Sequence, residues 1–162
     1  MSTMEKISFT LNGKAVTIET DPLKRLIDVL RTDCGLTGVK EGCSEGECGA
    51  CSILLNGKLV TSCIIPVGGV EGQSVMTIEG LKETEKGQVI IQAFADGGAV
   101  QCGFCIPGMV MATYYLLNNN PNPTEDEIRL GLSGNICRCT GYDLIVQCVR
   151  LASERGEALW KK

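Results

Sequence analysis

Ten cysteines and the absence of histidine constrain this 162-residue chain more than any other feature. Eight of the cysteines fall into two sets of four, and the other two, Cys34 and Cys148, stand apart. Without histidine the chain cannot form histidine-based catalytic triads, histidine-bearing zinc sites, Rieske centres or histidine-ligated haem. The chemistry of the chain is therefore expected to lie in its thiols, either as metal ligands or as disulfides.

The compartment decides between those two uses of cysteine. Residues 1–6 contain no charged region followed by an apolar stretch, so a secretory segment is not expected. In a reducing cytoplasm, this many cysteines favour metal binding over disulfides. We therefore expect a cytoplasmic protein with cysteine-ligated metal.

Composition excludes several other classes of protein. Hydrophobic residues make up 44% and charged residues 21% of the chain, which is typical of a globular protein rather than a disordered one. The net charge of −4 and the lack of a basic patch argue against nucleic acid or an anionic membrane as partner. The longest apolar run, near residues 105–117, is too short to span a membrane.

The first half of the chain reads as a small mixed sheet with one helix. Residues 5–20 alternate in polarity around Asn12-Gly13, and residues 52–62 do so around Asn56-Gly57, which predicts two hairpins. A helix is expected to open at Asp21-Pro22, with Asp21 as N-cap. Its apolar face would hold Leu23, Leu26, Ile27 and Leu30. A further strand is expected at residues 75–78, which completes a domain over residues 1–79.

The second half changes to helical patterning. Helices are expected at residues 88–96, 107–118, 125–132 and 143–156. Gly97-Gly98 ends the first of them, and Thr124 with Glu127 forms a capping box for the third. Leu144, Ile145, Cys148, Val149 and Ala152 are expected on the buried face of the fourth. Four short helices joined by tight turns predict a four-helix bundle over residues 80–162, with the joint near residues 80–87. The fold class is therefore α+β.

The first cysteine set has the spacing of plant-type [2Fe–2S] ferredoxins. Cys43, Cys48 and Cys51 lie on one loop, and Cys63 follows after eleven residues. Such a loop must wrap closely around an anionic cluster and aim backbone N–H groups at its sulfurs. Three glycines, Gly42, Gly46 and Gly49, permit the dihedral angles and the close approach that this needs. A four-cysteine zinc site and unligated structural cysteines are the alternatives.

The spacing of the second cysteine set, taken alone, indicates a particular kind of metal site less specifically than that of the first set. Cys102 and Cys105 precede one predicted helix, and Cys137 and Cys139 precede another. Helix N-termini favour anions, so the four thiolates suit a cluster if both helices begin at the same end. Zinc and a thioredoxin-like redox pair are alternatives, although the latter lacks a βαβ context. Cys34 and Cys148 read as small buried apolar side chains.

Three motifs together resemble a known family. Residues 41–51 read EGCSEGECGAC, residues 101–105 read QCGFC, and residues 134–142 read GNICRCTGY. In this order they resemble the iron–sulfur (small) subunit of the molybdenum hydroxylases, the xanthine dehydrogenase family. Its members include xanthine dehydrogenase, aldehyde oxidoreductase, nicotinate dehydrogenase and carbon monoxide dehydrogenase. The resemblance runs from about Lys6 to Ala152.

The resemblance implies two [2Fe–2S] clusters. An N-terminal β-grasp, plant-type ferredoxin-like domain would hold one with Cys43, Cys48, Cys51 and Cys63. A C-terminal four-helix bundle would hold the other with Cys102, Cys105, Cys137 and Cys139. The resemblance further implies that Gln101 and Cys139 contact the pterin of the molybdenum cofactor. Where this family usually carries Thr or Ser, the chain has Ile106, so we expect no side-chain oxygen to cap the helix that follows.

The same resemblance implies a role as the electron-transfer subunit of an oxidoreductase. Electrons would pass from a Mo-pterin centre through both clusters to FAD or an external acceptor, with no substrate chemistry on this chain. The expected partners are a large molybdenum-cofactor subunit and a FAD-binding subunit in a hetero-oligomer. Purines, nicotinate-like heterocycles, aldehydes and carbon monoxide stay open as substrates, and N-heteroaromatics are preferred. Arg138, between two ligands, is a candidate for tuning cluster potential. A zinc-stabilised cysteine-rich interaction module and a free-standing two-cluster ferredoxin are the rival interpretations.

Overall fold

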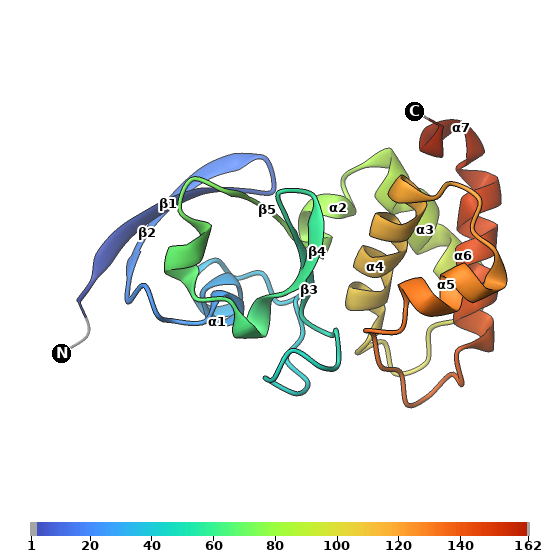
Figure 1. The fold of residues 1–162 in the computed structure, drawn as a ribbon, viewed down its shortest axis with the longest axis horizontal. Coiled ribbons are helices and arrows are strands. Elements are labelled where there is room, and N and C mark those ends of the chain that lie inside the picture. Colours follow the sequence, from blue (N-terminus) through green and yellow to red (C-terminus); the bar gives the residue numbers. More distant parts are fainter. Residues whose placement is uncertain (1–2, 162) are drawn as a thin grey trace.

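A five-stranded mixed sheet forms the N-terminal half of the protein. The computed structural model describes residues 3–161. The strands are β1 (Glu5–Leu11), β2 (Lys14–Thr20), β3 (Ser52–Leu55), β4 (Lys58–Thr61) and β5 (Ser74–Met76), in the spatial order β2-β1-β5-β3-β4. Only the pairing of β1 with β5 is parallel. Figure 1 shows this sheet curling around the short helix α1, with the helical half beside it.

Both predicted hairpins are confirmed. In the first, Phe9 pairs with Val16 across β1 and β2. Its two turn residues have positive φ angles, 51° at Asn12 and 81° at Gly13, and the turn of the second hairpin has the same character. Two consecutive positive φ angles match the twist of the flanking strands, which is why Asn-Gly turns predict hairpins well.

The predicted helix start at Asp21-Pro22 is wrong. The first helix is only α1 (Leu26–Asp28), continued by a π-helical turn, η1 (Val29–Asp33), and Arg25 stands at the N-cap position. Asp21 instead accepts a hydrogen bond from the N–H of Leu23 in a turn. Leu23 is 78% exposed rather than part of the apolar face.

Long-range backbone bonds explain this late start. The segment before the helix is held against residues 65–68, with hydrogen bonds from the N–H of Val67 to the carbonyl of Lys24 and from that of Gly68 to that of Pro22. This pairing keeps residues 22–25 extended or turned, and it overrides the local preference for a helix. Leu26, Ile27 and Leu30 are buried as expected.

The C-terminal half consists of helices. They are α2 (Ile78–Leu81), α3 (Glu85–Asp96), α4 (Ile106–Asn119), α5 (Glu125–Gly131), α6 (Asp143–Arg155) and α7 (Glu157–Trp160). The four longer ones, α3 to α6, correspond to the predicted helices and pack against one another. The capping box of Thr124 and Glu127 is confirmed at the start of α5. The short helices α2 and α7 were not predicted, and residues 77–78 do not belong to the last strand.

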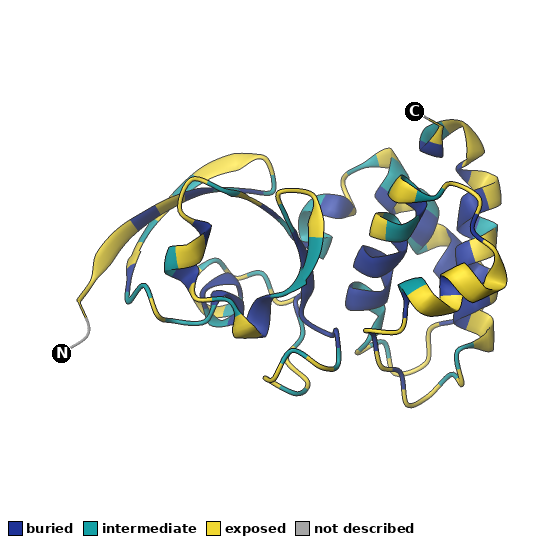
Figure 2. Cartoon of the chain, in the orientation of Figure 1, coloured by how far each residue is buried: buried dark blue, intermediate teal, exposed yellow. Residues whose placement is uncertain are grey.

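Buried apolar side chains form two clusters, one in each half. The first joins β1, β3 and β5 to α1 and η1, and the second joins α3 to α6 with α2, α7 and Leu54 of β3. Figure 2 shows the buried residues on the inner side of the sheet and on the facing sides of the helices. On α6, Ile145, Cys148 and Val149 are buried as predicted, whereas Leu144 is 37% exposed. No helix among the described residues combines the length and apolar character needed to cross a membrane.

Candidate metal centres

The first cysteine set lies on the loop between η1 and β3 and on the turn after β4. This loop uses left-handed backbone at Gly46 (φ 82°) and Gly49 (φ 68°), where a side chain would be strained. At Gly42 a Cβ atom would lie 2.9 Å from the sulfur of Cys48. Each of the three predicted loop glycines is therefore matched by a conformation or a contact that disfavours a larger residue.

Backbone N–H groups of this loop converge on the sulfur of Cys43. Those of Glu45, Glu47 and Cys48 donate to it over 3.4, 3.3 and 3.4 Å. These bonds, led by that of Glu45, lower the pKa of Cys43 to about 7. Hydrogen bonds to sulfur stabilise the charged form, so the loop is built to carry a thiolate.

Cys51 and Cys63 form the buried side of the same site. Each is 2% exposed, and Cys63 lies in the 3₁₀ turn η2 (Ser62–Ile64) that follows β4. Burial, followed by the neighbouring Cys51 thiol, raises the pKa of Cys63 to about 11. The first set thus divides into a loop pair, Cys43 with Cys48, and a buried pair, Cys51 with Cys63.

The second cysteine set lies at the N-terminal ends of α4 and α6. Cys105 is the N-cap residue of α4, which begins at Ile106, one residue earlier than predicted. No side chain caps this helix, as expected, although the N-cap position is held by Cys105 and not by the isoleucine; the N–H of Ile106 donates to the carbonyl of Gly103. Because Pro107 has no N–H and the N–H of Met109 donates to the carbonyl of Cys105, the first turn offers at most the N–H of Gly108 beside this thiol.

The four thiols of this set also form two pairs. The sulfurs of Cys102 and Cys139 are 3.6 Å apart, and both residues are exposed. Cys105 lies beside Cys137, which is buried. Burial first, and then the Cys137 thiol, raise the pKa of Cys105 to about 12. One pair of this set therefore faces the surface and the other faces the helices.

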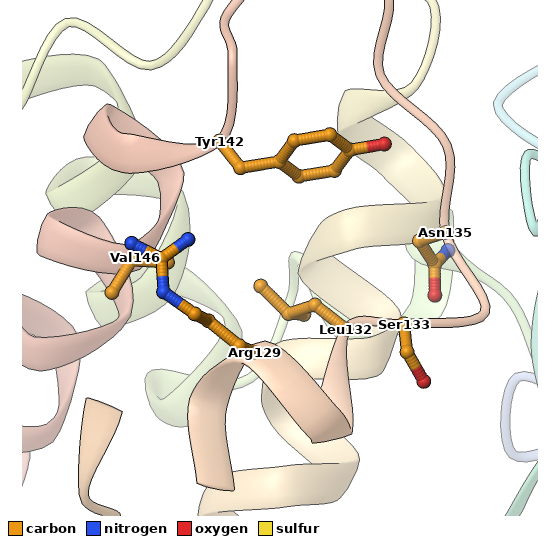
Figure 3. A pocket seen from close by; sticks show the side chains of 6 residues that line it. All are labelled: Arg129, Leu132, Ser133, Asn135, Tyr142 and Val146. Atoms are coloured by element: carbon orange, nitrogen blue, oxygen red, sulfur yellow. The ribbon is translucent and has the colours of Figure 1, made fainter. Parts of the chain in front are cut away.

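Thr140 and Tyr142 support Cys137. The hydroxyl of Thr140 donates to the Cys137 sulfur over 3.1 Å, and the N–H of Cys137 donates to the Tyr142 hydroxyl over 2.9 Å. Burial raises the pKa of Cys137, but the hydrogen bonds led by that of the Thr140 hydroxyl outweigh it, and the net pKa is lowered. Tyr142 has a left-handed φ of 72° at the start of α6. Figure 3 shows its ring extending across a pocket toward the loop that carries Asn135.

The pairing of thiols fits a two-iron cluster in each set. A [2Fe–2S] cluster is held by four cysteine thiolates, two on each iron. Within residues 3–161, no three or more cysteine, aspartate or glutamate side chains are placed to hold a single metal ion. All ten cysteines are free thiols, and Cys34 and Cys148 lie outside both sets.

Other predicted residues lie around the second set. Gln101 is exposed beside Cys102, so the surface at this site carries Gln101, Cys102 and Cys139. Arg138 is also exposed, and it lines a pocket between the two cysteine sets together with Cys48 and Phe104.

Sequence reasoning assigned no role to Asn135, Thr140 or Tyr142, although all three lie within the motif at residues 134–142. The available signal in the sequence was that polar residues lie next to the cysteines of this motif. The chain contains many such residues, however, and their spacing alone does not distinguish these three.

Comparisons with known proteins agree on both halves of the chain. The model of a 2Fe-2S iron–sulfur cluster binding domain matches residues 9–75, and that of a [2Fe-2S] binding domain matches residues 77–150. The nicotinate dehydrogenase small FeS subunit of Eubacterium barkeri is 52% identical over 149 residues, covering 92% of this chain and 95% of the relative. The xanthine dehydrogenase iron–sulfur-binding subunit of Escherichia coli O157:H7 is 45% identical over 145 residues, covering 88% of this chain and 91% of the relative.

Solved structures give the same result. A chain of quinoline 2-oxidoreductase from Pseudomonas putida 86 superposes with a TM-score of 0.90 at 40% identity, covering 97% of this chain and 98% of that chain. The aldehyde oxidoreductase of Desulfovibrio desulfuricans gives a TM-score of 0.89 at 38% identity, covering 96% of this chain but 17% of that longer chain.

Proposed function

Because the chain belongs to the family of small iron–sulfur subunits of the molybdenum hydroxylases, we propose which residues carry its electron-transfer role. Cys43, Cys48, Cys51 and Cys63 would hold one [2Fe–2S] cluster, and Cys102, Cys105, Cys137 and Cys139 would hold the other. Each cluster would take up and release one electron at a time. The observation that carries this proposal is the division of the eight thiols into four pairs.

The exposure of the second set suggests the direction of electron flow. Cys102 and Cys139 are exposed, and Gln101 lies beside them. We propose that Gln101 and Cys139 contact the pterin of a molybdenum cofactor held by a large partner subunit. Electrons would then enter at the helical site, continue to the ferredoxin-like site and leave to FAD or an external acceptor. A FAD-binding subunit completes the proposed hetero-oligomer.

The same proposal includes the division of the chain into two domains. We propose a β-grasp ferredoxin-like domain over residues 1–79 and a four-helix bundle over residues 80–162. The two apolar clusters support this division, since one is built from the sheet and α1 and the other mainly from the helices. We further propose a cytoplasmic location, for which the large number of cysteines is the argument.

An N-heteroaromatic compound is the proposed substrate class of the complex. Relatives that cover nearly the whole chain are named for nicotinate and quinoline, both nitrogen-containing aromatic rings. Since the substrate would bind in the large subunit, this part is tested separately. Activity of the purified complex on nicotinate or quinoline, with little on aldehydes, is expected, and the reverse preference would contradict it.

Low-temperature electron paramagnetic resonance of the dithionite-reduced complex tests the cluster assignment. Two distinguishable [2Fe–2S] signals and about four irons per chain are expected. Cys43→Ser should remove one signal and Cys102→Ser the other. Cys148→Ser is the matched control, because this cysteine is buried in the helical core outside both sets, and both signals should remain.

The rival interpretation, a zinc-stabilised interaction module, makes opposite predictions. It requires colourless protein with zinc and without a paramagnetic signal after reduction. Gel filtration adds an independent criterion, because a subunit of a hydroxylase should elute in a complex far larger than 17.3 kDa. A chain that elutes alone with two clusters would favour the free-standing ferredoxin instead.

A further inference from the structure

The two cysteine loops touch each other directly. The carbonyl of Cys48 accepts a hydrogen bond of 2.9 Å from the N–H of Ile136. Next to it, the side-chain amide of Asn135 donates to the carbonyl of Gly49 over 2.9 Å. Cys48 is a proposed ligand of one cluster, and Ile136 precedes Cys137, a proposed ligand of the other. Two adjacent hydrogen bonds therefore join the two sites.

Asn135 is built into this contact. It is only 5% exposed, and its amide also lies 3.4 Å from the hydroxyl of Ser52. The hydroxyl and the N–H of Ser52 donate to the same Gly49 carbonyl over 2.7 and 3.1 Å. Because the buried Asn135 amide has an acceptor, its burial costs little free energy, and the hydrogen bond fixes the position of the Gly49 carbonyl. Without this bond, the position of that carbonyl relative to the loop of Asn135 would be less well defined.

The space around the contact is also closed. A Cβ atom on Gly49 would lie 2.4 Å from the carbonyl oxygen of Gly134, and one on Gly108 would lie 2.3 Å from the Gly49 carbonyl oxygen. Three segments therefore meet without room for one more carbon atom: the first turn of α4, the loop before Cys137 and the loop after Cys48. In Figure 3, Asn135 lies at the edge of the pocket that Tyr142 and Leu132 also line.

We propose that Asn135 is a positioning residue that fixes the separation of the two clusters and thereby sets the rate of electron transfer between them. The inference rests on the proposed cluster ligands. Electron tunnelling falls exponentially with distance, so a small displacement of one loop against the other changes this rate strongly. Asn135 reaches no sulfur in the hydrogen bonds it makes, and its effect is exerted through the Gly49 carbonyl.

Two substitutions disturb the contact from different elements. Asn135→Asp keeps the size of the side chain but replaces the donor with a carboxylate that cannot donate to Gly49. Gly108→Ala forces the Gly49 carbonyl away from α4. Asn118→Asp is the matched control, because Asn118 is a partly buried amide near the C-terminal end of α4, where its oxygen accepts from Lys86.

The variants are compared in the purified complex. A flash-generated reductant is used to follow electron equilibration between the clusters, and the spin–spin splitting between their signals is measured in the fully reduced state. We expect Asn135→Asp and Gly108→Ala to keep both clusters but to show a several-fold slower equilibration and an altered splitting. Asn118→Asp should match the wild type in both measurements.

Each outcome of these measurements either supports or overturns the role proposed for Asn135. Unchanged equilibration and splitting with both clusters present would overturn the inference. If Asn135→Asp loses a cluster, Gly108→Ala is judged by the same criteria, and loss of a cluster in both variants would show a role in cluster binding alone. A wild-type complex without two [2Fe–2S] signals would instead refute the proposed function, which the variants do not affect.

Discussion

At the scale of single residues, hydrogen bonds to sulfur distinguish the two sites. Cys43 receives three backbone N–H bonds, whereas Cys137 receives one from a side chain, the hydroxyl of Thr140. A backbone N–H is removed only by proline, which also constrains the loop, whereas a hydroxyl is removed by an ordinary side-chain substitution. Thr140 therefore offers a way to change the potential of the helical site without changing its ligands.

Thr140→Val should lower the reduction potential of the helical cluster. The added electron makes the sulfurs more negative, so a lost donor disfavours the reduced form by roughly 20–60 mV. The measurement is a redox titration followed by paramagnetic resonance. Thr113→Val is the control, because the Thr113 hydroxyl donates to the Met109 carbonyl within α4, away from the cysteines. Equal potentials in Thr140→Val and the wild type would contradict the expectation.

Arg138→Ala should shift the potential of the helical cluster more than that of the other, because Arg138 lines a pocket that Cys48 also lines. Arg138 lies between Cys137 and Cys139 in the chain, and removing its positive charge disfavours the reduced cluster. Arg138→Lys keeps the charge and should behave like the wild type. A titration in which neither cluster shifts would count against a role for this side chain.

At the scale of elements, the start of α5 gives a prediction about pH. The N–H and the hydroxyl of Thr124, in that order, lower the pKa of Glu127 below its ordinary value of 4.5. A lowered folded-state pKa stabilises the protein above the unfolded-state pKa. The wild type should therefore be more stable than Glu127→Ala near neutral pH, and the difference should vanish as the pH falls through the folded-state value. Urea unfolding across this range measures it.

The control for this experiment is Gln147→Ala, which replaces an exposed glutamine of α6. Because a glutamine side chain does not titrate, its effect on unfolding free energy should stay constant over the same range of pH. A wild-type advantage over Glu127→Ala that persists in acid would show that the capping box acts through packing rather than through charge.

Elements with local determinants were predictable, and those with distant ones were not. Asn12-Gly13 and the Thr124 capping box act within a few residues, so their patterns identified the hairpin and the helix start. The start of α1 depends on backbone bonds to residues 65–68, which no local pattern reveals. Leu23 followed helical spacing but lies in a turn, and it is therefore exposed.

The candidate site shows the same division. Cysteine spacing indicated the two sets, because ligands on one loop or at one helix end are close in sequence. The pairing of Cys105 with Cys137 and the contact of Asn135 with Gly49 join segments that are distant in the chain. They depend on how the two halves pack, and only the structure reveals them.

At the scale of the whole molecule, the binding of iron and the stability of the fold should depend on each other. Four thiols in each half lie close together, and thiolates without iron would repel one another. Removing iron with a chelator under anaerobic, reducing conditions should therefore lower the unfolding temperature of the complex, and reconstitution should restore it. Calorimetry measures both steps. An unchanged unfolding temperature after complete loss of iron would contradict this coupling.

The exposure of Cys102 and Cys139 has a consequence for how the complex is made. Under the proposed arrangement, the open side of the helical site is also the side that the large subunit covers. Iron and sulfide must then be delivered before the subunits join, because afterwards no route from outside would lead to these two thiols. Assembly is thereby ordered in time, with a filled small subunit as the form that is ready to join its partner.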